Sequence, residues 1–232
     1  IETLTKASVP VAVLRDTPWP GADVAVCVGQ NQSDPSACDL PLAALDDASF
    51  DLAFSISVLE HLPPHELAVE AEARGFESLW FPEHSHIPTS RKSPWPGGAE
   101  LPKWYYDTYD PFVAMGAAAV VTKTIKLGTG VISLPYHNPL MVANRMVLLD
   151  HLTRGRVMLG VGPGALPSDA FMMGIPVAKQ RDRMDEALAV LVPLLRGETV
   201  TAKTEWFELN SARLQMTPFS RPSVDITVAS QV

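Results

Sequence analysis

The chain has 232 residues, of which 47% are hydrophobic and 19% are charged, and its formal net charge is −8. This balance is that of an ordinary folded domain rather than a disordered chain. The 18 Lys and Arg residues are scattered, whereas nucleic-acid binding needs clustered positive charge that displaces counterions. The apolar stretches are all much shorter than the roughly 20 residues that span a bilayer. We therefore expect a globular protein with no nucleic-acid and no membrane partner.

The two cysteines, Cys27 and Cys38, have neither the spacing of metal ligands nor that of a disulfide framework. The first residues also lack the basic and apolar segments of a secretion signal. A cytoplasmic location is the expectation. The sequence starts at Ile1 and ends at Val232, directly after a strand-like run, and so we expect a piece of a longer product.

The pattern of residues changes along the chain. Residues 1–63 are rich in Asp, Ser, Pro and Ala, and strand-like runs lie at 24–28 and 50–57. From Pro64 onward, apolar strand signals alternate with helix signals. We expect strands at 51–57, 78–82, 125–134, 156–161 and 225–230, and helices at 65–74, 111–123, 139–152 and 180–196. This alternation predicts an α/β fold with a parallel sheet and crossover helices, in a domain from 50 to 232 that follows an appendage at 1–49.

Two segments interrupt the alternation. Residues 85–110 contain many Pro and Gly residues, and a loop of that length commonly serves as a lid or a binding loop. Residues 206–216 are typical of a small hairpin inserted before the fifth strand.

The candidate site residues follow the strands, because parallel α/β sheets bind ligands at the carboxyl ends of their strands. Two strand ends carry histidines, at 81–86 and 134–138, and a third is rich in glycine, at 160–164. A histidine near neutral pH can donate or accept a proton, although a partly exposed structural histidine is the alternative. Glycine lets a ligand approach the backbone, but it equally permits a tight turn.

A metal site is not expected. Glu83, His84 and His86 could be ligands, but no third histidine or cysteine has a spacing that marks it as a partner. His65 and Glu66 begin like a zinc-protease motif, but Val69 stands where the second histidine belongs.

The aromatic residues and the residues at one helix end can each be interpreted in two ways. The aromatic group could line a pocket for an apolar substrate or be ordinary packing: Trp80, Trp95, Trp104, Tyr105 and Tyr106. Asp150 and His151 are more simply explained as residues that cap the end of a helix.

Three motifs resemble one known family. Residues 75–84 (GFESLWFPEH), 126–131 (KLGTGV) and 149–162 (LDHLTRGRVMLGVG) are similar to the bacterial-luciferase-like flavin-dependent oxidoreductases, and the resemblance covers about 64 to 230. It implies a (β/α)8 barrel with the flavin at the carboxyl ends of the strands. The chain offers about five of the eight βα units, and so a partial barrel of parallel strands with outer helices is expected.

The resemblance also implies a cofactor and a substrate class. The segments 162–169 and 203–207 look like those of monooxygenases that use FMN, whereas the loop at 87–98 is similar to members that use the deazaflavin F420. We expect FMN, with F420 as the alternative, acting on a small organic substrate with or without O2 as a second reactant. A homodimer, or a complementary half that completes the barrel, would be the protein partner.

Site residues carry over by position. The resemblance makes His84 the catalytic histidine, and it places Gly130 and Val131 in a bulged segment, often with a non-prolyl cis peptide, behind the flavin ring. It implies further cofactor contacts at Gly162, Gly164 and Ser230. Pro163 stands where some members carry an arginine that holds the flavin.

The substrate contacts that we expect come from the same strand ends. They are Trp80, His86, Tyr136 and His137.

A second resemblance is shorter. Residues 46–62 look like part of a class I S-adenosylmethionine-dependent methyltransferase, and 26–30 like a remnant of its glycine-rich loop. A methyltransferase remnant and a non-catalytic barrel fragment therefore remain alternative functions. The apolar run at 50–57 could still fill the place of the first barrel strand.

Overall fold

The computed structural model describes residues 12–14, 24–26, 53–54, 63–89, 106, 108–164 and 166–229. Near the start of the chain, β1 (Ala12–Leu14) and β2 (Val24–Val26) form an antiparallel pair of their own. Most of the methyltransferase-like segment and most of the long loop after His86 lie outside the described residues. Ser230 lies outside them as well.

The main sheet is parallel. Its strands are β3 (Ala53–Phe54), β4 (Ser78–Phe81), β5 (Lys126–Thr129), β6 (Ile132–Ser133), β7 (Val157–Gly162) and β10 (Asp225–Val228). They pair in chain order, with β5 and β6 both beside β7. Strands that pair in chain order through helical crossovers form five consecutive units of a (β/α)8 barrel, as expected.

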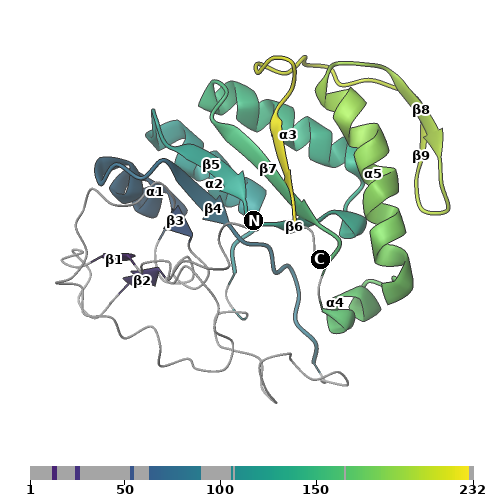
Figure 1. The fold of residues 1–232 in the computed structure, drawn as a ribbon, viewed down its shortest axis with the longest axis horizontal. Coiled ribbons are helices and arrows are strands. Elements are labelled where there is room, and N and C mark those ends of the chain that lie inside the picture. Colours follow the sequence, from purple (N-terminus) through teal and green to yellow (C-terminus); the bar gives the residue numbers. More distant parts are fainter. Residues whose placement is uncertain are drawn as a thin grey trace, which may run out of the picture.

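The helices follow one another along the sheet (Figure 1). They are α1 (Pro64–Ala73), α2 (Pro111–Val121), α3 (Pro139–Thr153), α4 (Pro167–Met172) and α5 (Gln180–Leu195). The core lies between helices and sheet, where Leu79, Phe81, Leu127 and Leu159 are almost fully buried. The other face of the strands carries Trp80, Gly128 and Met158 in register.

Local sequence explains where the helices begin. The first three start with a proline, whose missing N–H would have no partner at that position. Asp110 accepts a hydrogen bond from the backbone of Val113, and Asn138 accepts one from Leu140, so that both cap their helices. Gly75 follows the last residues of α1 and terminates this helix with a φ of +80°.

The expected strand at 125–134 is broken by a bulge. Gly128 is opposite Met158 and Ile132 is opposite Val161, so that the β5–β6 side has one residue more than β7 between these pairs. The peptide bond between Gly130 and Val131 is cis. A short 3-10 helix, Leu134–Tyr136, then takes the place of the strand's last residues. The apolar pattern ran on through the break, although Gly128 and Gly130 are the kind of residue that marks a bulge inside a strand.

Thr129 bridges the bulge to β7. Its buried hydroxyl donates to the carbonyl of Gly160 at 2.7 Å and accepts from the N–H of the same residue at 2.8 Å. The side chain thus supplies the strand-to-strand hydrogen bonds that the displaced backbone cannot make.

The hairpin also differs from the expectation. It pairs β8 (Val200–Lys203) with β9 (Glu208–Ala212), so that it starts before the expected 206–216. The apolar signal of Trp206 and Phe207 marks its turn rather than its first strand. Helix α4 was not expected either.

Polar clamps close the amino-terminal end of the strands. Glu72 accepts the backbone N–H groups of Lys123, Thr124 and Ile125, and Arg156 donates to the carbonyls of Thr122, Ile125 and Thr153. Both residues fix the connection from α2 to β5.

Asp150 and His151 form a third clamp at this end. The fully buried carboxylate of Asp150 accepts from the backbone and hydroxyl of Ser220 at 2.8 and 2.6 Å. His151 bonds the carbonyl of Thr217 at 2.8 Å. They hold the segment before β10 rather than simply capping α3. Within the described ranges, the helices are all too short or too polar to cross a bilayer.

Candidate functional site

The carboxyl ends of β4, β6 and β7 lie side by side, because these strands are parallel and paired. This edge brings together His84 and His86 after β4, Tyr136 and His137 after β6, and Gly162 and Gly164 at the end of β7. The expected convergence of two histidine-bearing ends and a glycine-rich end is therefore present.

Glu83 ties two of these strand ends together. Its side chain is 6% exposed and accepts a hydrogen bond from the backbone N–H of Ser133 at 2.7 Å. Its other oxygen lies 2.6 Å from Nε2 of His137, which donates to it. His137 also meets the ring of Phe112 edge-on. His137 is thus held from two sides, and Glu83 is a site residue rather than a spare metal ligand.

His84 is neutral in this setting. Burial lowers the pKa of its imidazole from 6.5 to about 4, and the charge of His86 adds to this, whereas the charge of Glu83 opposes it. A neutral ring can donate a hydrogen bond from one nitrogen and accept one at the other. Burial thus disfavours the protonated form, and the ring is uncharged at pH 7.

His86 links the end of β4 to α4. Its Nδ1 lies 2.7 Å from the hydroxyl of Ser85, and its Nε2 lies 3.2 Å from the backbone carbonyl of Asp169. Burial raises the pKa of the Asp169 carboxyl. The charge of His86 and a hydrogen bond from Ser168 oppose this shift, and the charge of Glu83 supports it. Both ring nitrogens of His86 are thus engaged.

Tyr136 and Gln180 form a second link. Nε2 of Gln180, the first residue of α5, lies 2.9 Å from the Tyr136 hydroxyl and 3.0 Å from the carbonyl oxygen of Pro163. Gln180 is 4% exposed. Burial raises the pKa of Tyr136 to about 12, with the charge of Asp169 acting in the same direction. The phenol keeps its proton at any working pH.

The glycines of β7 make room for protein atoms. A Cβ on Gly160 would lie 2.0 Å from the carbonyl oxygen of Thr129, and one on Gly162 would lie 3.1 Å from a methyl group of Val131. Gly164, at a φ of +86°, leaves space for Gln180 and the Tyr136 hydroxyl. These contacts explain the glycines by packing; their contact with a cofactor stays a prediction.

Val131 is raised by the bulge onto the inner face of the sheet. Its two methyl groups lie against Gly160 and Gly162, and the residue is partly exposed. Its neighbour Gly130 has no side chain, which leaves space for Trp80.

Trp80 packs inward on the same face. Its ring lies against Gly128, and its indole N–H donates to the hydroxyl of Ser78 at 3.0 Å. Because Ser78 begins β4, the polar end of the indole points away from the carboxyl edge. Substrate contact by Trp80 stays a prediction.

Metal-ligand geometry is absent from the described part of the chain, where no three His, Cys, Asp or Glu side chains are placed to hold an ion.

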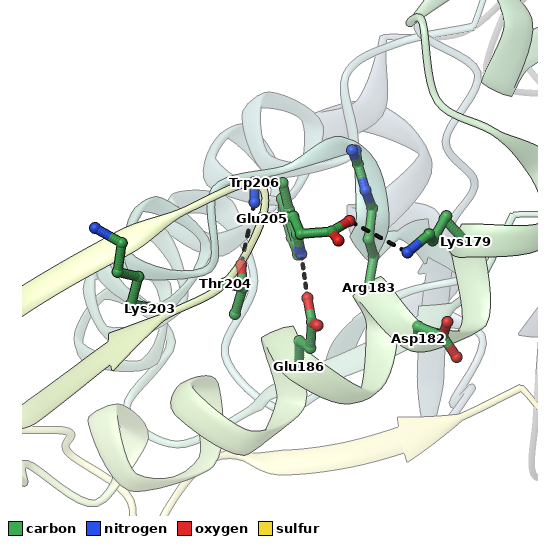
Figure 2. Close-up of a pocket in the computed structure, with 8 residues that line it drawn as sticks. All are labelled: Lys179, Asp182, Arg183, Glu186, Lys203, Thr204, Glu205 and Trp206. Atoms are coloured by element: carbon green, nitrogen blue, oxygen red, sulfur yellow. Dashed lines mark hydrogen bonds and ion pairs between the residues drawn. The ribbon is translucent and has the colours of Figure 1, made fainter.

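A hollow of about 330 Å³ lies elsewhere, between the start of α5 and the turn of the β8–β9 hairpin (Figure 2). Its charged walls pair with one another: Glu186 accepts from the Trp206 indole at 2.6 Å, and Lys179 lies 3.2 Å from Glu205. The sequence-predicted site residues lie outside it. We interpret it as the seam where the hairpin docks on α5.

Sequence reasoning missed the two residues that organise the edge. A charged residue two positions after the strand that ends at Phe81 was a signal for Glu83, but its partner His137 is 54 positions away. Gln180 gave no signal, because a polar residue at the start of a helix is ordinary.

Comparison with known proteins gives one family. The family model described as luciferase-like monooxygenase matches residues 64–231. A limonene 1,2-monooxygenase of Rhodococcus erythropolis is 41% identical over 181 residues, which are 78% of this chain and 40% of that protein. The chain thus spans two fifths of the length of this curated relative.

Two solved structures share the fold. An F420-dependent secondary alcohol dehydrogenase in complex with an F420–acetone adduct is 28% identical, with a TM-score of 0.58 over 72% of this chain and 48% of that one. The oxygenating constituent of 3,6-diketocamphane monooxygenase from Pseudomonas putida, in complex with FMN, is 24% identical, with a TM-score of 0.56 over 71% and 44%.

Proposed function

The chain belongs to the luciferase-like monooxygenase family, and on that premise we propose that it is part of an oxidoreductase that uses reduced FMN, or F420 as the alternative, on a small organic substrate. The observation that carries the proposal is Val131, which lies against Gly160 and Gly162 at the edge of the sheet where His84 and Tyr136 follow their strands. A flavin ring has a flat apolar face and a polar edge. Val131 offers an apolar platform, and the neighbouring strand ends offer polar groups.

Residues of the chain have separate roles in this proposal. Gly130 and Val131 support the ring, Gly162 and Gly164 shape the edge beside it, and Ser230 begins the segment for the phosphate. The bound cofactor would supply the electrons, which pass to the substrate or to O2. His84, uncharged at pH 7, would assist proton transfer by hydrogen bonding to the reacting group. His86, Tyr136 and His137 would line the substrate side, with Trp80 behind them.

The likeness to the limonene monooxygenase favours oxygen chemistry, and that to the F420-dependent alcohol dehydrogenase supports the F420 alternative. An absorbance titration of the purified protein with FMN and with F420 separates the two. We expect one of them to bind with a dissociation constant well below the millimolar range, where binding energy falls to about 4 kcal/mol. Binding of neither would refute the proposal.

His84 can be tested on the same protein. If the preferred cofactor supports turnover, we expect H84A to lose about 100-fold or more, as is typical when a proton-transfer group is removed. The titration should give the same dissociation constant as for the wild type. Unchanged turnover in H84A would remove His84 from the mechanism and leave the cofactor assignment in place.

A further inference from the structure

Gln180 has a fixed orientation, which its two partners impose. Side-chain amides can be placed either way round, and hydrogen-bond partners decide between them. The carbonyl oxygen of Pro163, 3.0 Å away, can only accept. The atom that faces it is therefore the amide nitrogen, which has a second hydrogen for the Tyr136 hydroxyl at 2.9 Å.

This orientation determines what the phenol can do. A phenol donates one hydrogen bond and accepts through its oxygen. Since the oxygen of Tyr136 already accepts from Gln180, its own proton must point away from Gln180. Within the described residues, no acceptor takes that proton. His86, whose ring lies 6.0 Å from the Tyr136 ring, has both nitrogens engaged elsewhere.

The proton is also permanent. Burial raises the pKa of Tyr136 to about 12, the negative charges of Asp169 and Glu83 act in the same direction, and the hydrogen bond from Gln180 opposes them. A half-buried hydroxyl with a proton and no acceptor is costly unless a ligand supplies one. Tyr136 lies at the carboxyl edge of the sheet, where the other strand-end candidates gather.

We propose that Gln180 is a positioning residue, which turns the Tyr136 hydroxyl so that its proton is offered to an acceptor oxygen of the molecule bound at this edge. That oxygen is a carbonyl or a hydroxyl group, carried either by the cofactor ring or by the substrate. The inference rests on the proposed function for the identity of the bound molecule. The orientation of the hydroxyl rests on this chain's atoms alone.

Gly164 contributes to the same hydrogen-bond network as Gln180 and Tyr136. A Cβ at this position would lie 2.5 Å from Nε2 of Gln180 and 2.8 Å from the Tyr136 hydroxyl. Its φ of +86° brings the carbonyl of Pro163 to the amide without a side chain in between. The glycine thus serves the hydrogen-bond network.

The orientation can be measured without any cofactor. The sequence has four tyrosines, so that protein labelled with ¹³C at tyrosine Cζ gives few signals, and the signal lost in Y136F belongs to Tyr136. We expect Q180L to shift this signal, because the carbon senses the hydrogen bond at its oxygen. The matched control is Q215L, at an exposed glutamine, which should leave it in place. An unshifted signal in Q180L would overturn the positioning role.

Binding tests the use of the proton. FMN and F420 are first titrated into the labelled wild type. Cyclohexanone, as a carbonyl probe, is then titrated into the cofactor-loaded protein. A shift of the Tyr136 signal by a cofactor assigns the acceptor to the ring, and one that appears only with cyclohexanone assigns it to the substrate. If both bind and neither shifts the signal, the inference fails.

A double-mutant cycle separates positioning from structural support. Y136F should weaken binding of the ligand that shifts the signal by about fivefold, the effect of one neutral hydrogen bond. Q180L should weaken it by a similar factor in the wild type and by none in Y136F. Q180E should weaken it at least as much, because its carboxylate takes the phenol proton. Equal losses from Q180L in both backgrounds would show a structural role only.

Failure of the proposed function is a distinct outcome. If neither FMN nor F420 binds the wild type, the proposed function is wrong. The shift of the Tyr136 signal in Q180L, together with a titration by cyclohexanone alone, then decides the inference. Urea denaturation of each variant confirms that it is folded when measured.

Discussion

Glu83 and His137 lie 54 positions apart in the sequence and are joined by a hydrogen bond of 2.6 Å across two neighbouring strand ends. The carboxylate holds the backbone of Ser133 with its second oxygen. One buried side chain thereby fixes both the strand after the bulge and the ring that follows it.

Removal of this link should be costly. We expect E83A to lower the free energy of unfolding by about 2 kcal/mol, because the partly buried backbone N–H of Ser133 and the partly buried ring of His137 lose their partner. Urea denaturation at pH 7 measures the loss. The control is E77Q, since Glu77 pairs with Lys126 at 2.7 Å but both side chains are about half exposed. That change should stay within about 0.5 kcal/mol. Similar small losses in both variants would show that burial does not strengthen the Glu83 link.

Gly160 should tolerate no side chain. A Cβ would lie 2.0 Å from the backbone oxygen of Thr129, in the bulge itself, where neither partner can move away. We expect G160A to lose at least about 3 kcal/mol of stability or to fail to fold.

The contrasting variant for Gly160 is G116A, in the middle of α2, where an added Cβ has nothing within 4 Å. Alanine suits a helix better than glycine, and G116A should gain about 0.5 to 1 kcal/mol. Thermal unfolding of the two proteins gives opposite shifts if the bulge is as tight as the distances indicate.

Glu72 should stabilise the fold in a defined pH range. Its partial burial is outweighed by hydrogen bonds from the backbone of residues 123–125, which lower its pKa from 4.5 to about 2. The contribution is complete above pH 4.5 and is lost as the pH falls towards 2.

The variant E72Q should therefore be less stable than the wild type at pH 7, by about 1 kcal/mol after screening by solvent. The difference should shrink below pH 4.5. Denaturation curves at several pH values test this, with E70Q on the same helix as a control of small effect at pH 7. A difference that persists at pH 2 would contradict the assignment.

His84 should affect the stability of the fold in a higher pH range than Glu72 does. Its folded pKa of about 4 lies below the ordinary value of 6.5, so that the unfolded chain binds the proton first as the pH falls. Stability should decrease from pH 6.5 to 4, and this decrease should be smaller in H84Q. The variant E72Q serves as the comparison, since its own window begins only at pH 4.5. An identical slope in H84Q and the wild type would show that His84 is more exposed to solvent than its surroundings indicate.

Much of the fold was predictable from the sequence. The parallel strands and four helices appear where apolar periodicity and prolines place them, because these signals are local. The bulge at Gly130 was not visible in the pattern, since its geometry depends on Thr129 meeting Gly160 on another strand. Only the family resemblance pointed to it.

The site was predictable in its residue types but less so in its links. His84, His86, Tyr136 and His137 follow strands, and parallel topology brings strand ends together whatever lies between them. The roles of Glu83 and Gln180 depend on which atoms face each other across 54 and 44 positions. Such contacts are set by register and helix placement, which no local signal encodes.

The clamps of Glu72, Arg156 and Asp150 all lie at the amino-terminal end of the strands, opposite the histidines and Tyr136. These clamps and the proposed site residues therefore lie at opposite ends of the strands, with the core between them. Substitutions at the carboxyl edge can alter what is bound without loosening these anchors. Apart from Glu83, whose links also hold the fold, residues at that edge can be exchanged while the amino-terminal anchors stay in place.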